Sequence, residues 1–293
     1  MATPEMELFE AIDYFKELGL DGIEIIIETD GFKCSFPLEH KAEELEALKA
    51  KLDSVDLPVA ALTPYLNLFN SLDEAERQQE CERFKRVIDI ARTLKCKNIR
   101  AYGGKFVDGE TDPDGRKKDA LVRSMRELGD YCAPDGIRIC LENHFGTMTT
   151  TARISMDLVK EIGHPNVGIL YDQANLAFFP AEEYEEAIDL QEGKIYYVHC
   201  KDLVYRYGVP EKPVFTMVSH VNPDDRTVRS RIPGEGILDW HAIARKLHDT
   251  GYDGWLSLEY ERRWGNQDLP DAVEGLPRAV AYMRKVLAGL PAD

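Results

Sequence analysis

Short apolar segments alternate with longer amphipathic segments along almost the whole chain, and this alternation restricts the possible folds most strongly. The apolar segments are 22–27, 58–63, 98–103, 138–143, 167–172, 195–200 and 255–260. The amphipathic segments lie near 5–18, 39–53, 72–95, 117–132, 153–162, 181–190, 239–249 and 271–288. Most of the apolar segments are short and continuously apolar, which is typical of strands buried on both faces of a parallel sheet. The pattern predicts an α/β fold with right-handed crossovers.

The spacing of these segments favours a (β/α)8 TIM barrel over a doubly wound sheet. Each interval holds one strand, one helix and two loops, and no glycine-rich phosphate loop follows an early strand. No linker, internal repeat or low-complexity segment interrupts the pattern, so residues 1–293 are predicted to form one domain. The chain opens directly on a helix, so the first strand of the barrel is expected to be absent.

A missing strand would leave unpaired edges on 22–27 and 255–260, and such edges promote pairing with another strand. We therefore expect the gap to be covered in one of two ways. A strand comes from outside the usual place, or a subunit contact covers the gap. The contact would belong to a homo-oligomer or to a complex with a small partner subunit.

Charge and cysteine content narrow the class of protein further. The chain has 53 acidic and 36 basic residues, for a formal charge of −17, and a field of that sign repels a nucleic-acid backbone. No apolar run approaches the roughly 18 residues of a membrane span. The six cysteines form no CxxC pair, and their scattered positions indicate reduced thiols rather than disulfides. We expect a cytoplasmic protein with neither a nucleic-acid nor a membrane partner.

Potential metal ligands and proton-transfer groups occur at the ends of four predicted strands. They are Glu142 and His144 in LENH, Asp172 in YDQAN, His199 and Lys201 in VHCKD, and Glu259 and Glu261 in LEYE. The carboxyl ends of barrel strands meet at one mouth, and a buried acid there is costly unless it is paired or bound to a metal. Three carboxylates and one imidazole suit a divalent cation, with manganese as the first choice and magnesium, cobalt or zinc as alternatives.

The order LENH, YDxxN, VHxKD, LEYE resembles that of the xylose isomerase-like barrels, a superfamily of sugar phosphate isomerases and epimerases. Its members include ketose 3-epimerases, inosose dehydratase, metal-dependent C-glycoside deglycosidases and type IV apurinic endonucleases. Segments 18–25, 233–240 and 251–259 also look like this family. The resemblance implies that the metal ligands are Glu142, Asp172, His199 and Glu259. The chain departs from the ketose 3-epimerases at Asn175, where those enzymes carry a histidine.

The motifs and the resemblance together predict a sugar isomerase or epimerase that removes a proton next to a carbonyl and passes through an enediolate. Glu142 and Glu259 would serve both as metal ligands and as proton-transfer groups, and His144 is a third acid/base candidate. The alternative is a lyase of the dehydratase or C-glycoside deglycosidase type, which eliminates a β leaving group after the same first step. A hydrolase like the apurinic endonucleases is disfavoured by the negative charge and the four-ligand set, and a non-catalytic sugar-binding protein is the remaining class.

Four further side chains are candidates for binding the sugar or sugar derivative that serves as substrate. They are Arg100, Lys105, Lys201 and Trp264. For Arg100 and Lys105, pairing with a carboxylate of the acidic chain is the alternative interpretation.

The interval before the last predicted strand is long, and residues 201–231 are expected to form an extended loop over the site. Long loops without secondary structure of their own are often functional lids. Tyr205, Phe215 and His220 would give this loop an aromatic cover for a ring-shaped substrate. The alternative is a plain surface excursion.

Overall fold

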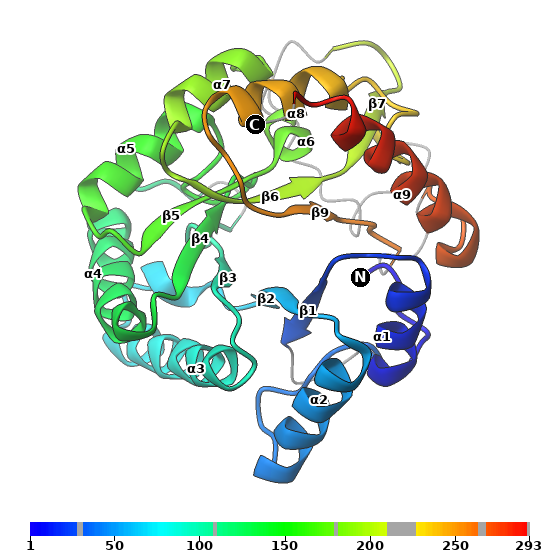
Figure 1. Ribbon diagram of the computed structural model, residues 1–293. Coiled ribbons are helices and arrows are strands. Elements are labelled where there is room, and N and C mark those ends of the chain that lie inside the picture. The colour runs from blue at the N-terminus through cyan, green and yellow to red at the C-terminus, as the bar shows by residue number, and fades with distance from the viewer. Residues whose placement is uncertain (28–31, 108–109, 179–180, 210–226, 263–267, 292–293) are drawn as a thin grey trace.

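Seven parallel strands form a nearly closed barrel, with the long helices around the outside (Figure 1). The computed structural model describes residues 1–27, 32–107, 110–178, 181–209, 227–262 and 268–291. The barrel strands, in their order around the sheet, are β1 (Ile23–Ile27), β2 (Val59–Pro64), β3 (Asn98–Ala101), β4 (Arg138–Glu142), β5 (Val167–Tyr171), β6 (Ile195–Cys200) and β9 (Leu256–Leu258). Each neighbouring pair is parallel, as the alternating sequence pattern predicts.

In the described part of the chain eight helices appear at the predicted positions, and the short helix Gln173–Leu176 is an addition to them. In chain order the helices are α1 (Leu8–Glu17), α2 (Ala42–Val55), α3 (Glu74–Thr93), α4 (Arg116–Cys132), α5 (Ala152–Ile162), α6 (Gln173–Leu176), α7 (Tyr184–Gln191), α8 (Trp240–Asp249) and α9 (Ala272–Ala288), with single 3-10 turns at Leu68–Asn70 and Ala133–Asp135. Gly19, Gly163 and Gly251 adopt the left-handed conformation at helix ends that the sequence predicts for them. No described helix has the length and apolar character needed to cross a membrane.

Successive side chains along each strand point to opposite faces of the sheet, so that one half faces the helices and the other half faces the barrel interior. On β6, Val198 and Cys200 belong to the large core between the sheet and the helices, whereas Tyr197 belongs to a small cluster inside the barrel. His199 shares the inward face with Tyr197 because side chains two residues apart lie on the same face of a strand. The six cysteines are all buried with free thiols, which agrees with the predicted reduced state.

The described sheet ends at β1 on one side and at β9 on the other, and a cavity of about 160 Å³ lies between these two strands. Met1, Ala2 and Thr3 line this cavity. Figure 1 shows the N-terminus beside α1 and β1. The barrel fold is thus confirmed. That a first strand is missing stays a prediction, as does the subunit contact expected to cover the gap.

Residues 201–231, expected to form an extended loop over the site, form strands at both ends, and a cover over the site stays a prediction. Asp202–Tyr205 forms β7 and Val228–Arg231 forms β8, and the two pair as an antiparallel ribbon. Leu203 and Val228 are buried in an apolar cluster that includes Phe178, which explains why these ends pair instead of remaining open. The sequence pattern misses the ribbon because its strands are far apart along the chain and no short turn joins them.

Asp202 fixes the chain that follows the ribbon. Its carboxylate accepts hydrogen bonds from the backbone N–H groups of Leu203, Gly234, Gly236 and Leu238, at 2.8 to 3.1 Å. A side chain at residue 236 would collide with this carboxylate, because a Cβ there would lie 2.1 Å from Oδ1 of Asp202. The carboxylate therefore holds the PGEG segment against the end of β7, beside the mouth of the barrel.

Candidate metal centre

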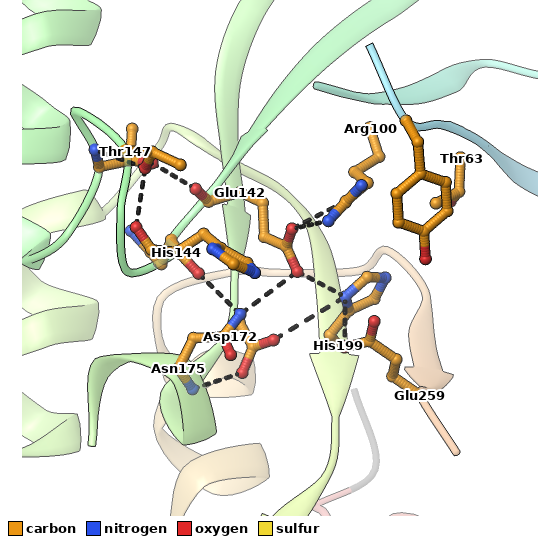
Figure 2. A network of polar contacts seen from close by, with 12 residues as sticks. Thr63, Arg100, Glu142, His144, Thr147, Asp172, Asn175, His199 and Glu259 are labelled. Atoms are coloured by element: carbon orange, nitrogen blue, oxygen red, sulfur yellow. Dashed lines mark hydrogen bonds and ion pairs between the residues drawn. The ribbon is translucent and has the colours of Figure 1, made fainter. Parts of the chain in front are cut away.

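Four strand ends bring four ligand side chains together inside the barrel (Figure 2). Glu142 is the last residue of β4, Asp172 directly follows β5, His199 lies on β6, and Glu259 directly follows β9. All four are buried, and one ligand atom from each lies within 4.8 Å of the others. These are the four residues that the sequence motifs single out.

The imidazole of His199 lies between the three carboxylates. Its Nδ1 is 3.1 Å from Oε2 of Glu259, 3.3 Å from Oε1 of Glu142 and 3.9 Å from Oδ2 of Asp172. Figure 2 shows one edge of the ring turned toward Glu142 and Asp172. One nitrogen and three oxygens therefore converge on one point.

Three of these converging atoms lack hydrogen bonds within the described structure. They are Oδ2 of Asp172, Nδ1 of His199 and Oε2 of Glu259, all buried. Lys201 Nζ lies 3.0 Å from the Asp172 oxygen and 2.7 Å from the Glu259 oxygen, close enough for ion pairing but without hydrogen-bond geometry. Buried polar atoms rarely stay unbonded, so unbonded oxygen and nitrogen atoms facing one point fit a bound divalent cation.

Asp172 divides its two oxygens between a helix and this centre. Oδ1 accepts a hydrogen bond of 2.9 Å from the backbone N–H of Asn175 and thereby caps the short helix α6. The side-chain amide of Asn175 donates to the Asn143 carbonyl at 3.0 Å and to Oε1 of Glu142 at 3.3 Å. Asn175 thus orients Asp172 through the cap and contacts Glu142 directly.

Two cations offset the negative charge of the carboxylates. The Arg100 guanidinium donates from Nε, at 2.8 Å, and from Nη2 to the same oxygen of Glu142, and both side chains are buried. Lys201 lies against Asp172 and Glu259 as described above, and its Nζ is 3.6 Å from Glu261. Two of the three basic residues predicted to bind substrate, Arg100 and Lys201, are therefore paired with carboxylates of the site.

The pKa values of the ligands follow from burial and these cations. Burial raises the pKa of Asp172 to about 7, and Lys201 offsets only part of this effect. Burial acts in the same direction on Glu142, but the Arg100 charge and the contact with His199 outweigh it and hold the pKa at about 2. For Glu259, His199 and Lys201 likewise outweigh burial and hold the pKa well below its usual value. The surrounding carboxylates raise the pKa of His199 well above its ordinary value despite burial.

His144 lies just beyond Glu142, after the end of β4. Its Nδ1 is 2.6 Å from the carbonyl oxygen of Phe145, and its ring packs against Phe145 and edge-on against Tyr102. Burial lowers the pKa of His144 below its ordinary value, so the ring is neutral near pH 7. This differs from the unperturbed pKa that the sequence alone suggests.

The other predicted substrate-binding residues are not brought to the ligands in the described structure. The side chain of Lys105 is exposed, and its carbonyl accepts a hydrogen bond from Asn70. Tyr205 donates to the carbonyl of Ala177 and packs with the cluster beneath the ribbon. Trp264, Phe215 and His220 lie outside the described residues.

Sequence reasoning missed Glu24, which faces the interior from β1. Its carboxylate accepts hydrogen bonds from Thr63, from Tyr197 at 3.0 Å and from Ser257 at 2.9 Å, and it lies 3.2 Å from Nε2 of His199. The available signal was a single acid within the otherwise apolar segment GIEIII. A lone acid on a strand buried on both faces requires donors inside the barrel.

Comparison with known proteins agrees with the fold. The family model for the xylose isomerase-like TIM barrel matches residues 12–286. An inosose dehydratase of Geobacillus thermodenitrificans is 29% identical over 144 residues, or 49% of this chain and 47% of that enzyme, so the chain spans about half the length of that relative. A 3-dehydroshikimate dehydratase of Bacillus anthracis is 24% identical over 255 residues, covering 86% of this chain and 84% of that enzyme.

Among solved structures, that of a 3-keto-D-glucoside 4-epimerase from E. coli is similar, with a TM-score of 0.73 and 20% identity over 97% of each chain. At this level of identity the likeness concerns the fold.

The raised pKa values of Asp172 and His199 predict a pH-dependent metal affinity. Because each group holds a proton that a cation must displace, the affinity for Mn²⁺ should rise with pH between about 5.5 and 7.5, and binding should release protons. Titration calorimetry in two buffers of different ionisation enthalpy measures both quantities. A Mn²⁺ affinity that is constant over this range, with no proton release, would contradict the prediction.

Proposed function

The chain belongs to the xylose isomerase-like TIM barrel family, and from this premise we propose that it is a divalent-metal-dependent enzyme that removes a proton next to the carbonyl of a keto-sugar. The observation that carries the proposal is the set of converging buried ligand atoms, three of which make no hydrogen bond. Such an arrangement is costly for a purely structural cluster, since each unbonded buried polar atom destabilises the fold. Manganese is the first choice of metal, with magnesium, cobalt or zinc as alternatives.

Glu142, Asp172, His199 and Glu259 would hold the cation. A divalent cation there withdraws charge from a substrate carbonyl and acidifies the neighbouring C–H bond. Glu142 and Glu259 approach the centre from different strands, β4 and β9, and both have lowered pKa values, so each is ionised near pH 7. We assign them the two proton-transfer positions, with Arg100 holding the second oxygen of Glu142 in place.

Lys201 favours dehydration as the overall reaction. Its ammonium group is almost buried among Asp172, Glu259 and Glu261, and these carboxylates keep its pKa well above the ordinary value. A fixed ammonium group beside the proposed base Glu259 is able to donate a hydrogen bond to a hydroxyl group that leaves from the β carbon. The two named relatives matched by sequence are dehydratases, which supports elimination of water as the step that follows proton removal.

Isomerisation or epimerisation, the reaction that the sequence favours, is the second candidate. It is supported by the presence of two carboxylates on different strands, because one can remove a proton and the other can return it.

The two basic residues of the site differ in their availability to a substrate. Arg100 is buried against Glu142 with 3% of its side chain exposed, whereas Lys201 keeps 11% of its side chain exposed. We therefore keep Lys201 as a proposed substrate contact and assign Arg100 to Glu142.

One incubation separates these reactions. The chain is mixed with Mn²⁺ and a panel of keto-sugars and 3-oxo-glycosides in deuterium oxide, and the products are followed by NMR and mass spectrometry. Release of water, or of an aglycone, identifies a lyase. Deuterium next to the carbonyl with every substituent retained identifies an isomerase or epimerase. No exchange and no product across a panel that the chain binds would contradict proton abstraction.

Removing single ligands should abolish metal retention. Glu142→Gln and His199→Asn should each lower the Mn²⁺ content of the folded chain by at least about tenfold, since each takes away one of four donor atoms. The control is Glu261→Gln, which changes an acid at the same mouth that is not among the four and should keep its metal. Elemental analysis of dialysed, folded protein measures the content, and full retention in both ligand variants would refute the assignment.

His144 is proposed as an acid/base group, not as a ligand. His144→Ala should leave metal content unchanged and lower the turnover number by roughly a hundredfold, as is common for a lost proton-transfer group. His241→Ala, on the exposed face of α8, is the matched control and should leave both quantities unchanged. Full activity together with full metal content would remove His144 from the mechanism, whereas weaker metal binding would indicate an orienting role.

We also propose that the chain associates through the gap between β1 and β9, either with itself or with a small partner subunit. The ends of the described sheet and the cavity between them leave apolar surface and strand edges available for pairing. Sedimentation velocity on purified chain should give a mass above that of a 33.3 kDa monomer. A strictly monomeric protein at micromolar concentration, purified without a partner, would refute this expectation.

A further inference from the structure

Glu24 contacts the only imidazole of the proposed metal centre from the side opposite the other ligands. Both of its oxygens are 3.2 Å from Nε2 of His199, while Nδ1 of the same ring faces the three carboxylates. The two nitrogens of a neutral imidazole have opposite roles, because one carries the proton and the other offers a lone pair. Which nitrogen carries the proton is set by the hydrogen bond that the ring makes.

We propose that Glu24 is a positioning residue that accepts the Nε2–H of His199 and thereby leaves Nδ1 as the ligand atom. This inference rests on the metal-dependent function proposed above. A carboxylate hydrogen-bonded to the distal nitrogen of a ligating histidine fixes its tautomer and its ring orientation and makes it a stronger ligand. His199 is fully buried, so its Nε2–H needs an acceptor within the protein.

Three further donors hold the Glu24 carboxylate in place. Thr63 on β2 donates to one oxygen, and Tyr197 on β6 and Ser257 on β9 donate to the other. These contacts leave little freedom for the carboxylate to rotate away from His199. Glu24 keeps 17% of its side chain exposed, toward the cavity between β1 and β9 that it lines.

The same contacts suggest a competing role, in which Glu24 only ties strands together. Through Ser257, it connects β1 to β9 across the gap in the sheet, and through Tyr197 it connects β1 to β6. A strand tie affects the free energy of unfolding, whereas a positioning residue also affects the affinity of the metal. Ser257 separates the two roles because its hydroxyl bonds the same carboxylate, whereas it meets His199 only as a neighbour in the pairing of β6 with β9.

The test compares Mn²⁺ binding by titration calorimetry in the wild-type chain, Glu24→Gln and Ser257→Ala, with the melting temperature measured on metal-free protein. Glu24→Gln should raise the dissociation constant for Mn²⁺ by about ten- to a hundredfold. Ser257→Ala should lower the melting temperature and should weaken Mn²⁺ binding less than Glu24→Gln does, because Thr63 and Tyr197 still hold the carboxylate. Unchanged affinity in Glu24→Gln, or an equal loss in both variants, would overturn the inference.

A measurement on the wild-type chain avoids dependence on the folding of the variants. In the chain loaded with Zn²⁺, the nitrogen-15 spectrum of His199, assigned by its loss in His199→Asn, should show the proton on Nε2. A proton on Nδ1 would overturn the role of Glu24. A wild-type chain that takes up neither Mn²⁺ nor Zn²⁺ would overturn the proposed function together with this inference, whereas normal uptake that is unaltered in Glu24→Gln overturns the inference alone.

Discussion

The mutual repulsion of three carboxylates inside an apolar barrel is the constraint on which the site depends. Glu142, Asp172 and Glu259 present oxygens within 4.8 Å of one another, where solvent does not screen them. Arg100 and Lys201 offset this repulsion, and the raised pKa values of Asp172 and His199 favour protons at these two positions as well. A divalent cation would take over the task of those protons, so the metal-free protein is already organised for the charge it is proposed to bind.

The sequence predicts the alternating strands and helices of the barrel well, but it does not predict contacts between residues that are far apart in the chain. Strand and helix periods are local and strong, and the four candidate ligand residues could be brought together from sequence because each stands at or near the end of an apolar strand. Glu24 was missed because its partners on β2, β6 and β9 are remote in sequence. The ribbon of β7 and β8 was missed for the same reason. The pairing of Arg100 with Glu142 depends on the register of β3 against β4, which sequence spacing does not define.

One set of side chains serves more than one reaction in this type of site. Proton removal by Glu142 or Glu259 is shared by elimination and by epimerisation, and the outcome depends on what happens to the charge that develops afterwards. A proton returned to carbon completes an epimerisation, whereas loss of a β hydroxyl completes a dehydration. In the proposed mechanism the position of Lys201 therefore matters more for the overall reaction than the identity of the ligands, because its ammonium group would assist departure of the hydroxyl as water.

The contact between Glu24 and Ser257 joins residues 233 positions apart, near opposite ends of the chain. Contacts of such separation form late in folding, because the entropy of closing a long loop opposes them until the intervening structure is in place. Since His199 receives its orientation from Glu24 and its fellow ligand Glu259 stands two residues beyond Ser257, the centre is completed only when the chain ends meet. In a nascent or partly folded chain the four candidate ligand side chains are consequently far apart, and they do not form a selective binding site for a metal ion.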